Sequence, residues 1–336
     1  MNNKRIYIAY TGGTIGMQKT DHGYAPTPGF LTEKVRANLE FQRAEMPEFE
    51  IFEYKDLMDS ANMSPDDWQI IADDIHSRYD EFDGFVILHG TDTMAFTASA
   101  LSFMFEGLGK PVIITGSQIP FAELRSDGQQ NLLNALYLAA NYPIAEVSLF
   151  FNNRLFRGNR STKVHADGFN AFGSPNLSPL LEAGIHIEPN KGVAPLVQKG
   201  KLQVHPITPQ PIGVVTLYPG ISAEVIRNIL QQPVKALILL SFGVGNAPEE
   251  PEILQLFAEA KQREILIVNL TQCLQGKVNM AGYATGNALS QVGVISGHDM
   301  TTEAALAKLH FLLSQDLSFD KRCQLMEISL RGELTP

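Results

Sequence analysis

The sequence predicts an α/β protein with a larger N-terminal domain on a doubly wound, mostly parallel sheet and a smaller C-terminal α/β domain. Apolar, β-branched runs alternate with helical patterns along most of the 336 residues, as in parallel sheets joined by helical crossovers. Residues 175–211 interrupt this alternation with many Pro, Gly, Asn and Lys residues, which indicates a linker with short β segments. We therefore expect domains at residues 1–190 and 213–336, joined by a linker at residues 191–212.

The individual elements follow from the spacing of apolar residues. Ser64 and Asp67 have the spacing of a capping box at a helix N-terminus, and the next apolar positions share one helical face. The elements expected in the N-terminal domain are strands 6–10, 85–88, 111–115 and 147–151, with helices 66–79, 93–105 and 131–140 between them. Those expected in the C-terminal domain are strands 213–217, 236–240, 265–270 and 292–295, with helices 223–230, 252–263 and 302–313.

Composition excludes several classes of partner. The net charge of −10 disfavours a nucleic-acid partner, because nucleic-acid binding depends on clustered Lys and Arg. No apolar run is long enough to span a bilayer, and no secretory signal precedes the first strand. Cys273 and Cys323 are far apart, which suits a reducing compartment better than a disulfide framework. We expect a cytoplasmic protein with no nucleic-acid or membrane partner.

Three glycine-threonine segments follow expected strands directly. Residues 11–16 have the sequence TGGTIG, residues 89–93 have HGTDT, and residues 115–117 have TGS. Because the carboxyl ends of parallel strands meet at one edge of a sheet, these segments are expected to line a single cleft. For any one segment, the alternative is that Gly and Thr only form a turn there and have no role in a site.

Spacing disfavours a nucleotide site and a metal site. Residues 12–16 lack the Gly-x-Gly-x-x-Gly pattern, and the polar, proline-bounded residues 17–26 do not form a helix that could hold phosphate. The eight histidines show no ligand spacing, so His89 and His165 are expected to be packed, hydrogen-bonded residues. We expect no metal and no organic cofactor.

A threonine hydroxyl acting as nucleophile is the chemistry that remains. Thr91 supplies a hydroxyl and Asp92 supplies a carboxylate. The glycine turn supplies backbone N–H groups that can stabilise an oxyanion. Lys163 is a candidate base, since lysine acts as one when it is withdrawn from water, and a surface charge is the alternative. Asp92 can instead hold a substrate ammonium group, and Asp59 and Ser60 lie in a segment typical of a turn. These residues alone do not select the attacking group.

Two longer signatures identify a family. The sequence YTGGTI at residues 10–15 and the sequence GFVILHGTDTM at residues 84–94 are highly specific in this order, and shorter matches occur at residues 115–117, 126–128 and 243–246. On these motifs the chain resembles the bacterial-type L-asparaginases, most closely their cytoplasmic type I branch, over essentially its whole length.

The resemblance implies a role for each motif residue. Thr14 corresponds to the nucleophile that forms an acyl-enzyme, Tyr24 to a residue of a mobile lid at residues 17–30, and Ser117 to a residue whose backbone carbonyl faces the substrate amide. A second group that activates water or passes protons corresponds to Thr91, Asp92 and Lys163. Asp92 corresponds to the residue that holds the α-amino group of the substrate. The loop of Asp59, Ser60 and Ala61 corresponds to the one that holds the α-carboxylate. The resemblance leaves open which threonine attacks first.

The resemblance also implies an assembly and an effector site. Similar enzymes are homotetramers of intimate dimers, with active sites between an N-terminal domain and a neighbour's C-terminal domain. Some type I members bind asparagine at an effector site, which corresponds here to Leu240, Ser241, Phe242, Thr271 and Cys273. An arginine of some relatives is Leu240 in this chain, which removes a bidentate carboxylate partner and argues against allosteric activation.

The expected function is hydrolysis of L-asparagine to L-aspartate and ammonia without metal or cofactor. Two alternatives from other classes are a non-catalytic amino-acid sensor and an amidase subunit of a tRNA-dependent amidotransferase. The net negative charge of the chain argues against the amidotransferase subunit, which would need a surface that binds RNA. Glutamine is one methylene longer than asparagine, so the degree of discrimination between these two substrates stays open.

Overall fold

The computed structural model describes residues 4–21, 23–196, 200–280 and 284–335. Contacts divide the chain into two compact units, residues 1–205 and residues 206–336, with the division inside the expected linker. Residue 22 of the expected lid and residues 197–199 of the expected linker lie outside the described residues. The two units are described separately below.

The first unit is built on an eight-stranded sheet with the order β13-β12-β9-β8-β7-β5-β1-β4. Its central strands β8, β7, β5, β1 and β4 are parallel, and β9 and β12 continue the sheet in antiparallel pairing. The strands are β1 (Arg5–Gly12), β4 (Glu48–Met58), β5 (Gly84–Leu88), β7 (Val112–Thr115), β8 (Val147–Phe151), β9 (Arg154–Arg157), β12 (Leu181–Ala183) and β13 (Ile187–Pro189).

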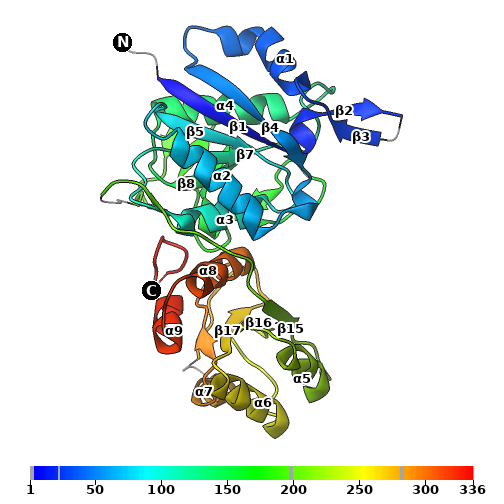
Figure 1. Ribbon diagram of the computed structural model, residues 1–336, viewed down its shortest axis with the longest axis vertical. Coiled ribbons are helices and arrows are strands. Elements are labelled where there is room, and N and C mark those ends of the chain that lie inside the picture. The colour runs from blue at the N-terminus through cyan, green and yellow to red at the C-terminus, as the bar shows by residue number, and fades with distance from the viewer. Residues whose placement is uncertain (1–3, 22, 197–199, 281–283, 336) are drawn as a thin grey trace. The chain divides into compact units, whose positions relative to one another are not determined.

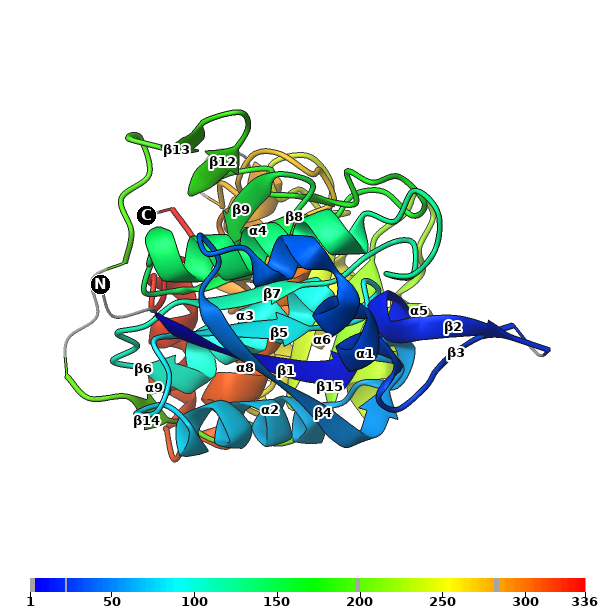
Figure 2. The same ribbon diagram turned by 90° about the horizontal axis from the view of Figure 1, so that it is seen from above.

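Helices cover both faces of this sheet. The helices α1 (Phe30–Ala37) and α4 (Gly128–Asn141) lie on one face, and α2 (Pro65–Ser77) and α3 (Met94–Met104) lie on the other (Figures 1 and 2). The predicted capping box at the start of α2 is confirmed, because the Asp67 carboxylate accepts the Ser64 N–H at 2.7 Å. Helices on both faces of a mostly parallel sheet confirm the doubly wound fold of the larger domain.

Short elements complete the first unit. They are the hairpin of β2 (Met17–Thr20) and β3 (Gly23–Pro26), the antiparallel pairs β10 (Thr162–Lys163) with β11 (Phe172–Gly173) and β6 (Phe105–Glu106) with β14 (Gln203–Val204), and the 3-10 helices η1 (Thr14–Gly16), η2 (Leu39–Gln42), η3 (Ser60–Asn62) and η4 (Gly158–Arg160). The hairpin of β2 and β3 projects outward from its sheet (Figure 2).

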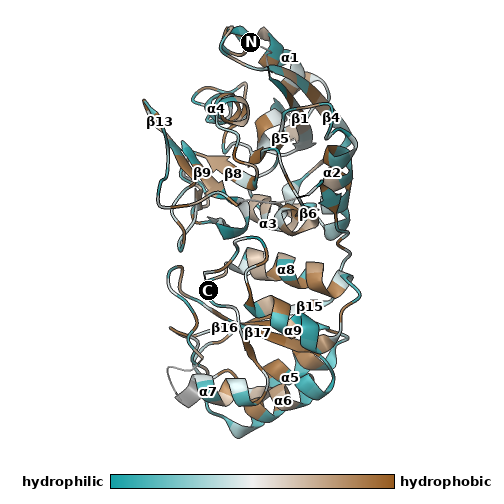
Figure 3. Ribbon diagram, turned by 90° about the vertical axis from the view of Figure 1, so that its left-hand side faces the viewer, coloured by the Kyte–Doolittle hydropathy of each residue, from teal (hydrophilic) through white to brown (hydrophobic). Residues whose placement is uncertain are grey.

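The second unit is a smaller parallel α/β layer structure, as predicted. Its sheet has the order β15-β16-β17-β18, with α5 and α6 packed on one face and α8 and α9 on the other. The strands are coloured as hydrophobic in Figure 3, whereas hydrophilic colour gathers on helices such as α9. The elements are β15 (Ile212–Thr216), α5 (Ala223–Gln231), β16 (Ala236–Ser241), α6 (Pro251–Gln262), β17 (Leu266–Thr271), α7 (Ala284–Gln291), β18 (Ile295–Ser296), α8 (Thr302–Ser314) and α9 (Phe319–Glu327).

The structure adds elements that periodicity did not predict. β4 is the edge strand of the large sheet, and its sequence EFEIFEYKDLM alternates polar and partly buried residues because one side meets water. The helices α1, α7 and α9 were also not predicted. Within residues 175–211, where short β segments were predicted, β12 and β13 extend the large sheet. No helix of the described residues combines the length and apolarity needed to cross a membrane.

The connections around β1 determine where a ligand can bind. The chain passes from β1 to β4 on one side of it and then to β5 on the other side. Loops that leave the carboxyl ends of β1 and β5 therefore diverge to opposite sides, and such a switch point leaves a crevice between them. The TGGTIG and HGTDT segments follow these two strands.

A buried ion pair holds the end of the second unit. Lys308 on α8 and Glu333 near the C-terminus are fully buried, with Nζ 2.5 Å from Oε1. Lys308 also donates to the backbone carbonyls of Met326 and Ile328, and Glu333 accepts the backbone N–H groups of Leu330 and Arg331. Burial lowers the pKa of Lys308, and Glu333 acts in the opposite sense. The pair joins α8 to the terminal segment.

We predict that Lys308→Met destabilises this segment, because it leaves the Glu333 carboxylate buried without its cation. Such a loss costs about 3–5 kcal/mol. Amide hydrogen exchange of peptides from residues 302–335 should accelerate on the order of a hundredfold or more. Lys4→Met is the control, because the Lys4–Asp83 pair is exposed and contributes about 0–1 kcal/mol. Equal protection in wild type and Lys308→Met would contradict the prediction.

Candidate active site

The loops after β1 and β5 touch at two glycines. Gly13 has φ 85° and ψ 174°, a conformation suited to glycine, and a Cβ atom at Gly13 would lie 2.4 Å from the Gly90 nitrogen. The Thr11 hydroxyl donates to the Leu88 carbonyl at 2.8 Å and ties the same two strand ends together. Thr14 and Thr91 each follow one of these glycines directly, and their side chains are half-buried and buried, respectively. The two threonine segments are therefore adjacent, as predicted.

The loop after β4 closes the other side of Gly90. A Cβ atom at Gly90 would lie 2.3 Å from the Ser60 hydroxyl oxygen, so Ser60 packs directly on this turn. Asp59 begins the single turn of η3 and accepts the Ala61 N–H at 3.1 Å, and the Thr93 hydroxyl donates to the Ser60 carbonyl at 2.7 Å. Ser60 is buried, whereas Asp59 and Ala61 are exposed.

The loop after β7 packs on the opposite flank. A Cβ atom at Gly116 would lie 2.2 Å from the His89 carbonyl oxygen, so residues 115–117 contact the HGTDT segment. Ser117 is buried beside the N-terminus of α4. The predicted convergence of three strand-end segments at one edge of the sheet is thus confirmed.

Lys163 reaches the HGTDT segment from the short strand β10. Its Nζ lies 2.9 Å from the Thr91 Oγ1 and 2.7 Å from the Asp92 Oδ1. The Lys163 side chain is 21% exposed and that of Asp92 is 63% exposed. Pairing of Lys163 with Phe172 on β11 fixes the strand that carries it. Lys163 is therefore directed at the threonine rather than standing alone on the surface.

Gln118 is a fourth member of this group, which the sequence did not reveal. Its Nε2 donates to the carbonyls of Ala166 and Gly168, both at 3.1 Å, so its Oε1 faces Thr91. The Thr91 hydroxyl donates to this oxygen at 3.2 Å. Lys163 therefore donates to the Thr91 oxygen in the resting arrangement, because the hydroxyl proton points toward Gln118.

Asp127 holds the loop that carries Gln118. Its carboxylate accepts the backbone N–H groups of Gln118 and Ile119 at 3.0–3.1 Å, and the Asn131 amide at 3.3 Å. The Phe121 N–H donates to the Ile15 carbonyl at 2.9 Å, which joins the same loop to η1. In the sequence, Gln118 was marked only by its place directly after the TGS segment, whereas Asp127 lies in the short family match at residues 126–128.

Tyr24 lies on the projecting hairpin of β2 and β3 and is 49% exposed. Partial desolvation and a hydrogen bond with the Glu123 carboxylate raise the pKa of Tyr24. Glu53 on β4 anchors the end of this segment, because it accepts the Gly29 N–H at 2.6 Å and the Thr32 hydroxyl at 2.5 Å. The hairpin is thus held at its base while Tyr24 remains accessible.

The candidate effector residues belong to the second unit, at the carboxyl ends of β16 and β17. The Thr271 hydroxyl donates to the Gly243 carbonyl at 2.5 Å and accepts the Cys273 N–H at 3.0 Å. The Ser241 hydroxyl is buried and donates to the Leu270 carbonyl. Leu240 and Phe242 are partly buried and Cys273 is exposed. The hydroxyl protons in this group are engaged by backbone carbonyls.

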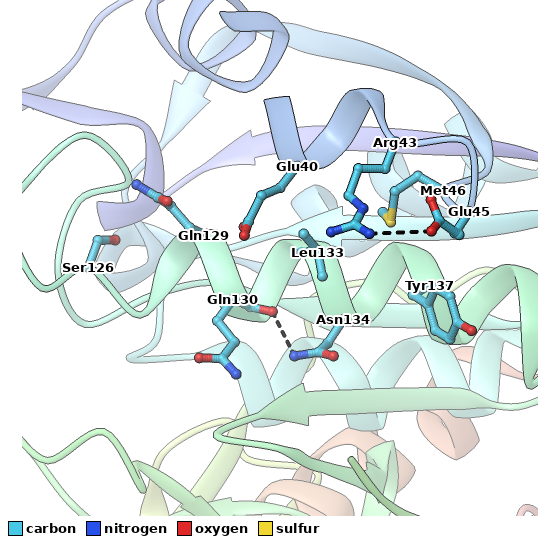
Figure 4. A pocket seen from close by; sticks show the side chains of 10 residues that line it. All are labelled: Glu40, Arg43, Glu45, Met46, Ser126, Gln129, Gln130, Leu133, Asn134 and Tyr137. Carbon is cyan, nitrogen blue, oxygen red and sulfur yellow. Dashed lines mark hydrogen bonds and ion pairs between the residues drawn. The ribbon is translucent and has the colours of Figure 1, made fainter. Parts of the chain in front are cut away.

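A separate hollow of about 590 Å³ lies between η2 and α4. Figure 4 shows its polar lining, where Arg43 pairs with Glu45 and the Asn134 amide donates to the Gln130 carbonyl. None of the candidate site residues lines this hollow. Across the described ranges, no group of three or more His, Cys, Asp or Glu side chains is arranged to hold a metal ion.

Comparison with known proteins identifies relatives over the whole chain. The family model described as asparaginase, N-terminal, matches residues 5–194, and that described as glutaminase/asparaginase C-terminal domain matches residues 211–326. L-asparaginase 1 of Escherichia coli K12 is 68% identical over 100% of this chain and 99% of its own length. The 60 kDa lysophospholipase of Homo sapiens is 44% identical over 99% of this chain and 62% of its own length.

Solved structures agree with the sequence relatives. The crystal structure of L-asparaginase I from Vibrio cholerae superposes with a TM-score of 0.94 at 65% identity, covering 99% of this chain and 100% of that one. The thermostable L-asparaginase from Thermococcus kodakarensis superposes with a TM-score of 0.89 at 32% identity, covering 99% of each chain.

We predict that Gly13→Ala separates the two threonine segments. Its Cβ would overlap the Gly90 backbone in addition to straining a positive φ, which alone costs about 1–3 kcal/mol. Gly29→Ala is the control, because Gly29 has φ 79° with open space around it. Thermal unfolding should show a clearly lower midpoint for Gly13→Ala than for Gly29→Ala. Equal midpoints would show that the glycine contact is unimportant.

Proposed function

The chain belongs to the asparaginase family, and we propose that it hydrolyses L-asparagine to L-aspartate and ammonia through an acyl-enzyme on Thr14. The observation that carries the proposal is the Thr91–Lys163–Asp92 group, with Nζ at 2.9 and 2.7 Å from its two partners, beside the loop of Thr14. A hydroxyl nucleophile next to a proton-transfer group is the arrangement that acyl transfer requires.

In the first half-reaction the Thr14 oxygen attacks the side-chain carbonyl carbon of asparagine. The C–O bond forms as the carbonyl oxygen becomes an oxyanion, which backbone N–H groups of the glycine turns stabilise. The C–N bond then breaks, and the proton released by Thr14 leaves with ammonia. Tyr24 on the hairpin covers the bound amino acid during this step.

In the second half-reaction water attacks the same carbonyl carbon. As the new C–O bond forms, the water passes a proton to the Thr91 oxygen and the Thr91 hydroxyl passes its own proton to the Thr14 oxygen of the breaking ester bond, so Thr91, supported by Lys163, ends the step as a hydroxyl. The products are L-aspartate and free Thr14. Gln118 keeps the Thr91 hydroxyl in one orientation before this step, as its hydrogen bond at 3.2 Å supports.

Substrate is held by charge at its other end. The exposed Asp92 carboxylate receives the α-ammonium group, and the loop of Asp59, Ser60 and Ala61 receives the α-carboxylate. The backbone carbonyl of Ser117 faces the reacting amide. Fixing both charged groups of the amino acid orients the amide toward Thr14.

We further propose a cytoplasmic homotetramer, in which a neighbour's second unit completes the exposed side of each site. The two other functions are not favoured. L-asparaginase 1 of E. coli is 68% identical, whereas a glutamyl-tRNA(Gln) amidotransferase component of Methanobrevibacter smithii is 32% identical over 77% of its own length. A non-catalytic sensor would have no need of the Lys163–Thr91 contact. Allosteric activation is not proposed, because Leu240 lacks the charge to hold a carboxylate.

We predict that Thr14→Ala lowers kcat for ammonia release from L-asparagine by at least about a thousandfold, because the nucleophile is lost. Thr14→Ser keeps a hydroxyl and should retain measurable turnover. Initial rates from a coupled ammonia assay test both variants, with circular dichroism as the control for folding. Near-normal turnover by Thr14→Ala would remove Thr14 from the mechanism.

We predict that Thr91→Val or Lys163→Met forms the acyl-enzyme but hydrolyses it slowly. Intact-mass spectrometry after mixing with L-asparagine should show an aspartyl adduct, and peptide mapping should locate it at Thr14. The double variant Thr14→Ala/Thr91→Val is the matched control and should carry no adduct. An adduct on any other residue, or its persistence in the double variant, would contradict the assignment.

A further inference from the structure

His89 is the first residue of the HGTDT segment, and the proposed mechanism gives it no role. It follows β5, and its N–H donates to the Thr115 carbonyl at 2.9 Å, which continues the sheet ladder. Its side chain is fully buried. The sequence predicted a packed, hydrogen-bonded histidine, and the structure confirms it. A buried imidazole directly before the reacting loop can control that loop through hydrogen bonds.

The hydrogen bonds of His89 assign its tautomer. Nδ1 lies 2.7 Å from the Gly90 carbonyl oxygen, which can only accept, so Nδ1 carries a proton. Nε2 lies 2.9 Å from the Thr97 Oγ1, which itself accepts the indole N–H of Trp68 at 3.1 Å. The Thr97 hydroxyl proton is thereby available to Nε2. The hydrogen bonds therefore all donate in one direction: Trp68 donates to Thr97, Thr97 donates to His89, and His89 donates to Gly90.

The surroundings keep the imidazole neutral. Burial lowers the pKa of His89 to about 4, although the Gly90 carbonyl and the Asp67 carboxylate act in the opposite sense. The remaining neighbour of Nε2 is the Met63 sulfur at 2.9 Å, a weak acceptor without charge. Above about pH 5 the ring therefore carries one proton, on Nδ1.

This tautomer fixes the peptide between Gly90 and Thr91. The peptide is trans, so its carbonyl and its N–H point in opposite directions. With the carbonyl held by the buried imidazole, the Thr91 N–H is directed away from the interior, and no described residue accepts a hydrogen bond from it. Gly13 and Ser60 pack closely against Gly90, where a Cβ atom would lie 2.3 Å from the Ser60 hydroxyl oxygen.

We propose that His89 is a positioning residue that, as the Nδ1–H tautomer held by Thr97 and Trp68, aims the Thr91 N–H at the developing oxyanion. This inference rests on the proposed acyl-transfer function. The donor acts only when charge develops on the carbonyl oxygen, so its orientation affects kcat more than substrate binding. His89 does not touch the substrate.

Two substitutions separate the roles of the two ring nitrogens. His89→Asn places an amide N–H where Nδ1 stood and keeps the donor to Gly90, whereas His89→Gln places its amide nearer the position of Nε2. We expect His89→Gln to lower kcat on the order of 10- to 100-fold with KM nearly unchanged, and His89→Asn to retain most of kcat. Equal kcat for the two variants, or a loss confined to KM, would overturn the proposal.

Nuclear magnetic resonance of ¹⁵N-histidine-labelled protein tests the tautomer without turnover or substitution. At pH 7.5 His89 should show a proton on Nδ1. His310 is the internal control, because its Nδ1 accepts the Gln210 N–H at 3.2 Å and its proton therefore lies on Nε2. A proton on Nε2 of His89, or a doubly protonated ring, would overturn the proposal. Failure to release ammonia from asparagine would instead count against the proposed function and leave the tautomer result intact.

Discussion

The contact between Gly13 and Gly90 is the constraint on which the candidate active site depends. Parallel pairing of β1 with β5 brings their two following turns side by side, and the absence of both Cβ atoms lets the turns touch. Any side chain at Gly13 would meet the Gly90 backbone at 2.4 Å. Because Thr14 and Thr91 each follow one of these glycines, their relative position is set by backbone packing rather than by side-chain contacts, and this makes it rigid.

Polar groups around Thr91 form a continuous network that reaches well beyond the turn. Lys163 and Gln118 hold the Thr91 hydroxyl, and Asp127 holds the backbone of Gln118. On the buried side, His89 holds the Gly90 carbonyl. Buried donors and acceptors that lack partners are costly, so a network in which each member is paired favours one arrangement over its alternatives. The hydroxyl, its neighbouring N–H and the lysine are thus oriented before substrate binds.

The residues proposed to meet substrate differ in exposure from the residue proposed to take part in proton transfer. Thr91 is 8% exposed, whereas the Asp92 side chain is 63% exposed and Tyr24 is 49% exposed. Groups that recognise charge can remain near water until the ligand arrives, and Glu53 anchors the end of the segment that carries the hairpin of Tyr24. A rigid buried centre beneath an open, charged rim suits an enzyme that must release two small polar products.

The sequence alone determined the fold class, the strand-end location of the threonine segments and the family. Buried strands and amphipathic helices have local periods, and the motifs YTGGTI and HGTDTM are contiguous. Only the tertiary structure decided which groups Lys163 contacts, since a lysine 72 residues from Thr91 could, from the sequence, equally be a surface charge. It also revealed the edge strand β4 and the hydrogen bonds of Gln118 and His89. These depend on which groups meet across the sheet edge, and long-range contacts of this kind leave no periodic trace in the chain.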